Sequence, residues 1–251
     1  MIDHSPFTRT GTGPNAVLFL HGIAGSPGHF RDLVPVIPEA FSVYGILLDG
    51  HSGKMENFSR SSMKKWKTQV SATLADLFAR HEKVVIVAHS MGTLFAIQAA
   101  IDHPDKIPAL FLLAVPTRPW VRFSTWVTAL QVAFGKRNTP STQAMAGETA
   151  LELTPMLWKY IGWAPRMAEL LWECSRVRRI LPRLATPAEV FQSQVDELVS
   201  IRSCKDLIHP HMQVTVLRNS GHFVSGPEDI RFLQGRLSET LADLTFPNKG
   251  L

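Results

Sequence analysis

Cysteine and long apolar runs are both scarce in this chain. Only two cysteines, Cys174 and Cys204, occur among 251 residues, which is too few for a disulfide framework. No run of about 18 apolar residues is present to span a bilayer, and residues 1–15 hold no apolar stretch of signal-peptide length. Histidine pairs at the helical spacing of metal ligands are also missing. We therefore expect a soluble, cytoplasmic protein without a bound metal.

The composition is that of a chain with a packed core. Apolar residues make up 45% of the sequence and charged residues 19%, a balance that excludes a disordered protein. The length fits a single α/β domain that carries an insertion.

The excess positive charge is concentrated in one segment. The formal net charge is +5, but residues 116–183 alone hold ten Lys and Arg against four Glu, and the rest of the chain is close to neutral. The same segment contains five of the six tryptophans. Because its composition differs from that of both flanks, we interpret 116–183 as an insertion and expect no nucleic-acid-binding surface.

Outside this insertion, strand-like and helix-like patterns alternate. Apolar residues three or four positions apart predict a helix over 63–77, with Ser61 or Ser62 as its cap, and another over 227–244. Such alternation favours a mostly parallel sheet of about six strands covered by helices, with ligands at the carboxyl ends of the strands. The six apolar runs of strand length are 16–20, 41–48, 84–88, 109–115, 189–192 and 213–217.

A serine follows the third of these runs. Residues 88–92 read Ala-His-Ser-Met-Gly, and a helix-like stretch follows over 93–101. Small residues around Ser90 permit the sharp strand-to-helix turn that lifts a strained serine hydroxyl clear of the backbone. An ordinary helix-capping serine is the alternative. The position directly after a strand favours a nucleophile.

A candidate base and a candidate acid follow the last two predicted strands. His222 comes after the last strand across a Gly turn, and Asp196 comes after the strand before it, across a short loop. Glu197, next in the chain and expected to face away, and Asp49 are the rivals for the acid. Asp49 precedes Ser90 and so breaks the chain order Ser, Asp, His, which favours Asp196.

Two backbone N–H groups are candidates to stabilise an oxyanion. Met91 directly follows the serine, and Ile23 lies in the loop 21–27 that leaves the first predicted strand. Glycines in that loop let the backbone approach a ligand closely, although an ordinary Gly and Pro turn is the alternative. Together, nucleophile, base, acid and donors predict acyl transfer through a serine.

These segments resemble the α/β-hydrolase superfamily, and within it bacterial carboxylesterases and monoacylglycerol lipases most. The resemblance lies in 17–27, 88–92, 192–199 and 220–222, in that order. It implies an α/β-hydrolase fold whose core is 1–115 and 184–251, with a helical cap over 116–183. It further implies a catalytic triad and an oxyanion hole and no cofactor; the residues concerned are Ser90, Asp196 and His222 for the triad and Ile23 and Met91 for the hole.

Three features of the sequence depart from the pattern of that superfamily. Ala88 stands where the first glycine of the serine turn is usual. Residues 49–53 read Asp-Gly-His-Ser-Gly where relatives usually show Gly-His-Gly, so His51 is either structural or a ligand contact. Only about fifteen residues precede the first predicted strand, so we expect the usual extra strands at that edge to be absent.

The expected function is hydrolysis of carboxylic esters with short to medium acyl chains, or of monoacylglycerols. A thioesterase, an aminopeptidase and a non-catalytic binding protein on the same fold are the alternatives. The few glutamates of the cap are outnumbered by basic residues, which disfavours an aminopeptidase that must bind a substrate ammonium.

The expected partner is a small-molecule ester, with no nucleic acid and at most peripheral contact with membrane lipid. We expect most apolar residues of the cap to pack it onto the core and a few to line the pocket. Arg176, Arg178 and Arg179 are expected to form a solvated face, with an acidic headgroup, a CoA phosphate or an anionic membrane surface as the alternative partner.

Overall fold

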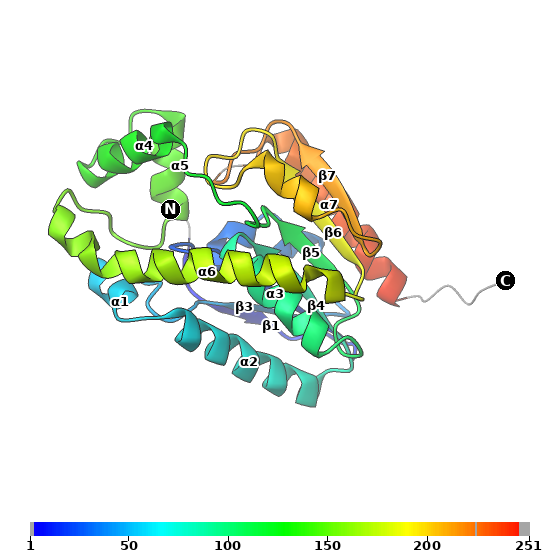
Figure 1. The fold of residues 1–251 in the computed structure, drawn as a ribbon. Coiled ribbons are helices and arrows are strands. Elements are labelled where there is room, and N and C mark those ends of the chain that lie inside the picture. The colour runs from blue at the N-terminus through cyan, green and yellow to red at the C-terminus, as the bar shows by residue number, and fades with distance from the viewer. Residues whose placement is uncertain (1–2, 224, 246–251) are drawn as a thin grey trace.

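The computed structural model describes residues 3–223 and 225–245 and is built around one seven-stranded sheet with helices on both faces (Figure 1). Six strands are parallel to one another, and the short edge strand β1 runs antiparallel to β3. The strand order is β1-β3-β2-β4-β5-β6-β7. The strands are β1 (Phe7–Arg9), β2 (Ala16–Leu20), β3 (Ser42–Ile46), β4 (Val84–His89), β5 (Leu110–Leu113), β6 (Ala188–Ser193) and β7 (Met212–Leu217).

Helices cover both faces of the sheet, and a largely helical segment joins β5 to β6. The α-helices are α1 (Met55–Ser59), α2 (Met63–Arg80), α3 (Met91–Asp102), α4 (Phe123–Ala133), α5 (Pro140–Glu148), α6 (Ala164–Ile180) and α7 (Pro227–Thr245). Short 3₁₀ turns are η1 (Pro27–Phe30), η2 (Val34–Val36), η3 (Leu157–Trp163), η4 (Leu181–Arg183) and η5 (Ile201–Asp206). The predicted helices over 63–77 and 227–244 correspond to α2 and α7, and the side chain of Ser62 caps α2 by accepting the Lys65 N–H.

The sheet is buried on both faces, which explains why its central strands are continuous apolar runs. Leu18 and Leu20 of β2 face a core that includes residues of α2, α3 and α6, whereas Val17 and Phe19 face a second core that includes α7 and η1. Side chains alternate between faces along a strand, so each strand contributes to both cores. The predicted α/β-hydrolase architecture, a mostly parallel sheet flanked by helices, is confirmed.

The edge strand β1 was not expected, and the prediction that no extra strand precedes β2 is wrong. β1 has only three residues and no apolar run of its own, so periodicity gives no signal for it. It pairs with β3, where the Phe7 ring lies over Gly45. A Cβ at Gly45 would lie 2.4 Å from that ring, so the absence of a side chain there makes the pairing possible.

Helix α6 lies within the predicted cap but packs against the core. Cys174 and Val177 on its inner face are buried in the same apolar cluster as α2 and α3, and Figure 1 shows α6 running across α3. Lys67 of α2 is ion-paired with the buried Glu173 of α6, which also holds Arg176. The segments that rise above the sheet edge are therefore α4, α5 and the chain up to η3. In the described part of the chain, no helix has the length and apolar character needed to cross a bilayer.

A Gly92→Ala substitution should destabilise the fold, because α3 begins in backbone contact with β2. A Cβ at Gly92 would lie 2.1 Å from the carbonyl oxygen of Leu20, and relief requires a backbone shift that costs about 1–3 kcal/mol. Gly235→Ala on α7 is the matched control, because nothing lies within 4 Å of its Cβ position and alanine is the better helix former. Urea unfolding should show a loss for the first variant and none for the second. Equal stabilities of the two variants would contradict this packing.

Candidate active site

Ser90 occupies a strained turn between β4 and α3. Its φ of 52° and ψ of −123° are unusual for a residue with a side chain, and its N–H donates to the carbonyl of Leu113 at 2.9 Å. Such backbone strain costs about 1–3 kcal/mol and persists only where neighbouring structure enforces it. Among the described residues, the only other non-glycine positions with positive φ are Ala24, after β2, and Ala114, after β5. All three strained residues follow neighbouring strands at the same sheet edge.

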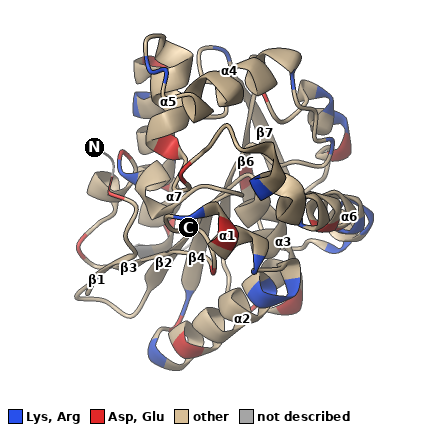
Figure 2. Ribbon diagram, turned by 90° about the vertical axis from the view of Figure 1, so that its left-hand side faces the viewer, with Lys and Arg blue, Asp and Glu red and all other residues tan. Residues whose placement is uncertain are grey.

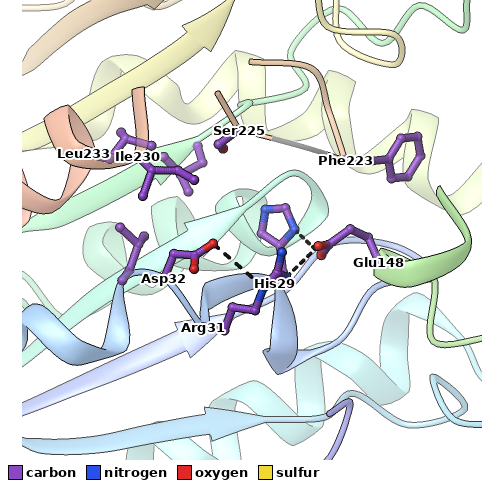
Figure 3. A pocket seen from close by; sticks show the side chains of 10 residues that line it. His29, Arg31, Asp32, Glu148, Phe223, Ser225, Ile230 and Leu233 are labelled. Carbon is purple, nitrogen blue, oxygen red and sulfur yellow. Dashed lines mark hydrogen bonds and ion pairs between the residues drawn. The ribbon is translucent and has the colours of Figure 1, made fainter. Parts of the chain in front are cut away.

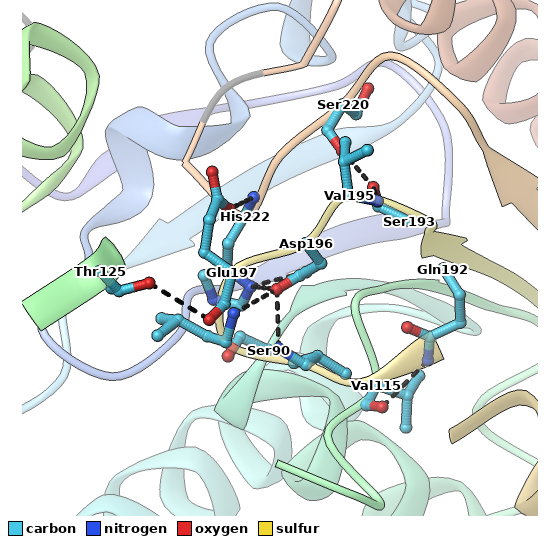
Figure 4. A network of polar contacts seen from close by, with 12 residues as sticks. Ser90, Val115, Thr125, Gln192, Ser193, Val195, Asp196, Glu197, Ser220 and His222 are labelled. Carbon is cyan, nitrogen blue, oxygen red and sulfur yellow. Dashed lines mark hydrogen bonds and ion pairs between the residues drawn. The ribbon is translucent and has the colours of Figure 1, made fainter. Parts of the chain in front are cut away.

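Asp196 and His222 form a buried pair in the loops that follow β6 and β7. The Nδ1 atom of His222 lies 2.9 Å from Asp196 Oδ2 and 3.1 Å from Oδ1. Oδ1 also accepts the N–H groups of Leu198 and Val199, each at 2.7 Å. Figure 4 shows the pair together with Ser90.

The Asp196 carboxyl stays ionised in this setting. Burial by itself raises its pKa, but the charge and hydrogen bond of His222 and the N–H groups of Leu198 and Val199 outweigh burial and lower the pKa below its ordinary value. An ionised carboxylate at Nδ1 favours the tautomer with the proton on Nδ1, which leaves Nε2 of His222 free to accept a proton.

Glu197 also contacts His222, which sequence reasoning missed. Its Oε2 accepts the backbone N–H of His222 at 2.6 Å, so its side chain does not face away from the site. Its carbonyl accepts the N–H of Arg122 at 2.9 Å and the Thr125 hydroxyl at 3.3 Å (Figure 4). Glu197 thereby joins the histidine loop to the start of α4. Nothing in the sequence pattern indicates this contact, because it depends on how two distant loops meet.

Ile23 and Met91 lie in the two turns that flank Ser90. Gly22 is in contact with the serine, since a Cβ there would lie 2.8 Å from Ser90 Cβ, and Met91 begins α3 directly after it. No described residue accepts a hydrogen bond from the N–H of Ile23 or of Met91. Both N–H groups are therefore free to act as donors, as an oxyanion hole requires.

A buried histidine fixes the loop that carries Ile23. The Nδ1 atom of His21 donates to the carbonyl of Gly22 at 2.8 Å, and its Nε2 accepts the N–H of Leu48 at 3.0 Å. Burial and the neighbouring His51 lower the pKa of His21 well below its ordinary value, so the ring is neutral and both bonds are maintained. This ring therefore ties the loop after β2 to the loop after β3.

His51 is a core residue in this structure. Its ring is fully buried and packs edge-on against Phe58 and Trp66, and its Nδ1 bonds the carbonyl of Asp49 at 3.1 Å. Burial lowers the pKa of His51 to about 4, so the ring is neutral at pH 7. Of the two interpretations left by the sequence, these contacts favour the structural one.

The rings of His222, His89 and His29 lie one against the next, and His29 contacts Glu148 at the end of α5. The ring of His89 lies 4.6 Å from that of His222 and 3.9 Å from that of His29, between centroids. His29 Nδ1 lies 3.1 Å from Oε2 of Glu148, whose Oε1 accepts from Arg31 at 2.6 Å. Figure 3 shows Glu148 directed at both partners. A cavity of about 60 Å³ opens beside this cluster, and one of about 30 Å³ lies behind His222.

Most tryptophans of the predicted cap do not pack onto the core. Trp163 does, against Phe58 and Tyr160. The other four have more than half of their surface exposed: Trp120, Trp126, Trp158 and Trp172. Phe123, Phe134 and Met156 are exposed as well, so the expectation that most apolar residues of the cap pack it onto the core is wrong.

The basic cluster on α6 is not one uniform surface. Arg176 is bound to the buried Glu173 and to Gln98 of α3, so it is structural. Arg179 is exposed and, among the described residues, its side chain bonds only the carbonyl of Ser175. A solvated face is therefore correct for Arg179 and wrong for Arg176.

The sheet order, the turn at Ser90 and the sequence together place the chain among proteins with the α/β-hydrolase fold. The family model described as alpha/beta hydrolase fold matches residues 15–136. In sequence, the chain is 28% identical over 235 residues to a pimeloyl-[acyl-carrier protein] methyl ester esterase of Xanthomonas oryzae pv. oryzae, covering 84% of this chain and 89% of that protein. It is 24% identical over 216 residues to a thermostable monoacylglycerol lipase of a Bacillus species, covering 84% and 83%.

Solved structures support the same fold. One described as that of metagenome-derived lipolytic enzymes superposes with a TM-score of 0.72 at 21% identity, covering 95% of this chain and 98% of that chain. The monoacylglycerol lipase of Paleococcus ferrophilus gives 0.67 at 16% identity, covering 94% and 98%. The resemblance to α/β-hydrolases noted from the motifs is confirmed.

Glu148→Gln should lower stability in a pH-dependent way. Burial raises the pKa of Glu148, but His29 and Arg31 outweigh it and lower the pKa below its ordinary value. A lowered folded-state pKa gives stability that is complete above the unfolded pKa of about 4.3 and is lost as pH falls through the folded value. At pH 7 the variant should lose about 1–3 kcal/mol.

Urea unfolding at pH 7 and in the acid range measures this difference. The gap between wild type and Glu148→Gln should narrow as the pH falls below about 4.3. Glu152→Gln, at an exposed carboxylate without an ion pair among the described residues, serves as control and should match wild type. A gap that is the same at every pH would show that charge at Glu148 is not the stabilising feature.

Proposed function

We propose that this protein is a serine hydrolase that cleaves carboxylic esters through an acyl-enzyme on Ser90. The observation that carries the proposal is the buried Asp196–His222 pair at the sheet edge where Ser90 is held in a strained turn. In this assignment His222 is the general base, Asp196 orients it, and the N–H groups of Ile23 and Met91 form the oxyanion hole. No cofactor enters the reaction.

The reaction follows from these positions. Nε2 of His222 takes the proton from the Ser90 hydroxyl as Oγ bonds to the ester carbonyl carbon, and Asp196 stabilises the imidazolium that forms. The carbonyl oxygen becomes an oxyanion and accepts hydrogen bonds from the N–H groups of Ile23 and Met91. Collapse breaks the bond to the alcohol oxygen, which receives the proton from His222. Water, deprotonated by His222, then attacks the acyl carbon; the bond to Ser90 Oγ breaks, Oγ takes the proton from His222, and the acid is released.

The substrates that fit best are esters with short to medium acyl chains, or monoacylglycerols. Relatives over most of the chain are named as a methyl ester esterase and a monoacylglycerol lipase. A thioesterase would use the same groups. An aminopeptidase is disfavoured because the carboxylates near the site are already occupied: Glu148 by His29 and Arg31, and Glu197 by the His222 N–H. A binding protein would have no use for a strained serine beside an ionised Asp–His pair.

Ser90→Ala should abolish turnover without unfolding the protein. Removal of the nucleophile of a working triad lowers kcat on the order of 10⁴-fold or more. Hydrolysis of p-nitrophenyl butyrate measures the loss. Ser225→Ala is the matched control, because Ser225 lines the cavity behind His222 but lies outside the proposed triad, and it should stay near wild type. Near wild-type hydrolysis by a folded Ser90→Ala variant would refute the proposal.

Glu197→Ala should slow the reaction by releasing the backbone of His222. A lost charge-assisted hydrogen bond of about 1.5–3 kcal/mol corresponds to a fall in kcat/KM of about 10- to 150-fold. Glu197→Gln keeps an acceptor oxygen at the same place and should cost only a few-fold. The effect should lie in kcat, because Glu197 does not belong to the proposed substrate contacts. Equal activity of the alanine and glutamine variants would remove Glu197 from the account.

A further inference from the structure

Helix α4 turns its apolar face outward. Phe123 is 82% exposed, Trp126 65% and Phe134 63%, and Val127 and Leu130 are exposed beside them. At 3.6 residues per turn these five side chains fall within an arc of about 100°, the width of a face that would normally be buried. We call this set, Phe123, Trp126, Val127, Leu130 and Phe134, the α4 stripe.

The α4 stripe is directed away from the loop of the proposed acid. Thr125 and Val132, on the other side of α4, are buried, and the Thr125 hydroxyl bonds the carbonyl of Glu197. Helix α4 also packs against α5. The stripe is therefore not the wall of the Asp196–His222 site, and the described residues do not cover it.

The surroundings of the stripe carry charge of one sign. Residues 116–147 contain four basic residues and no acidic one. Arg118 is ion-paired with Asp206, but Arg122 just before α4 and Lys136 and Arg137 just after it are exposed and have no ion pair among the described residues. In Figure 2 the ribbon of α4 is tan along its length, since it contains no charged residue. Glu148, the next acid in the chain, is buried and directed at His29 and Arg31.

We propose that α4 lies in the interface of an anionic phospholipid surface, with its stripe among the acyl chains. Helices that bind this way combine an apolar face containing Trp, Phe and Leu with basic residues that meet the lipid phosphates. Trp126 is an amphipathic ring suited to the headgroup level, and Arg122, Lys136 and Arg137 supply charge at both ends of the helix. The partner is thus a membrane surface and not a soluble protein.

A second copy of this chain is a poorer occupant of the stripe. The stripe has five side chains, whereas the interface of a stable dimer takes about 20–30 residues on each partner and buries about 800 Å² of each. Two copies joined at α4 would also bring their unpaired basic residues together, which disfavours the contact. A lipid surface can bind an apolar patch of this size, and its anionic headgroups carry the charge opposite to that of the basic residues around α4.

Membrane docking through α4 has a consequence for the proposed ester hydrolysis. The first turn of α4 touches Glu197, which holds His222, so a docked helix places the site beside the lipid phase. The surface-binding proposal does not depend on the hydrolytic one. Vesicle binding is therefore measured with Ser90→Ala as well as wild type, and both should bind equally, so that failure of either proposal is read separately.

Co-sedimentation with vesicles tests the docking surface. The full chain is incubated with vesicles of phosphatidylglycerol and phosphatidylcholine in equal parts, or of phosphatidylcholine alone. We expect binding to the anionic vesicles that weakens with salt and with Lys136→Gln/Arg137→Gln. Phe123→Ser/Trp126→Ser should weaken it at least 10-fold. Trp172→Ser, which removes a Trp of similar exposure on α6, should leave it unchanged. Circular dichroism spectra and urea-unfolding midpoints that match wild type verify that the α4 variants are folded.

Three results would overturn the proposal. The first is no sedimentation of wild type with anionic vesicles. The second is an equal loss in the stripe variant and in Trp172→Ser, which would mean that exposed apolar residues bind without regard to place. The third is a dimer of wild type by light scattering that Phe123→Ser/Trp126→Ser converts to monomer, which would assign the stripe to a second copy.

Discussion

The turn at Ser90 is the constraint on which the rest of the site depends. Ser90 is held at positive φ in a turn that two glycines allow to pack closely. Gly22, in the loop after β2, is in contact with Ser90, and Gly92, in the first turn of α3, is in contact with the carbonyl of Leu20. The approach of α3 to β2 sets the direction of the serine and frees the N–H of Met91. Backbone strain of about 1–3 kcal/mol is thus balanced by the packing of the central sheet, whose strands are buried on both faces.

The loops beyond the serine are tied to one another rather than packed independently. Asp196 is held by two backbone N–H groups and holds His222, while Glu197 fixes the His222 backbone and the start of α4. Glu148, at the end of α5, is bonded to His29 and Arg31 in the segment that follows β2. Helix α4 therefore meets the core at the backbone carbonyl of Glu197, and α5 meets it through the Glu148 carboxylate. A change in the position of α4 would be transmitted to His222 through Glu197.

Sequence patterns predicted the parts of this structure that are local and strongly periodic. The central strands are apolar runs because both sheet faces are covered there, and the proposed serine, acid and base could be singled out because each follows a strand. Strand β1 was not predicted because its three residues are stabilised by pairing with β3, where Phe7 lies over Gly45. The contact of Glu197 with His222 and the outward direction of the α4 stripe depend on how distant segments meet. A tryptophan-rich segment has the same composition whether its rings are buried or exposed, so composition alone predicted packing that is absent.

The central claim is that Ser90 is the nucleophile activated by the Asp196–His222 pair, and labelling with a fluorophosphonate tests it most directly. The folded protein is incubated with the probe, its intact mass is measured, and the modified peptide is sequenced. We expect one adduct per chain on Ser90, formed orders of magnitude more slowly when Asp196→Asn removes the carboxylate that orients His222. An adduct on another residue, or labelling of Ser90 at an unchanged rate in Asp196→Asn, would contradict it.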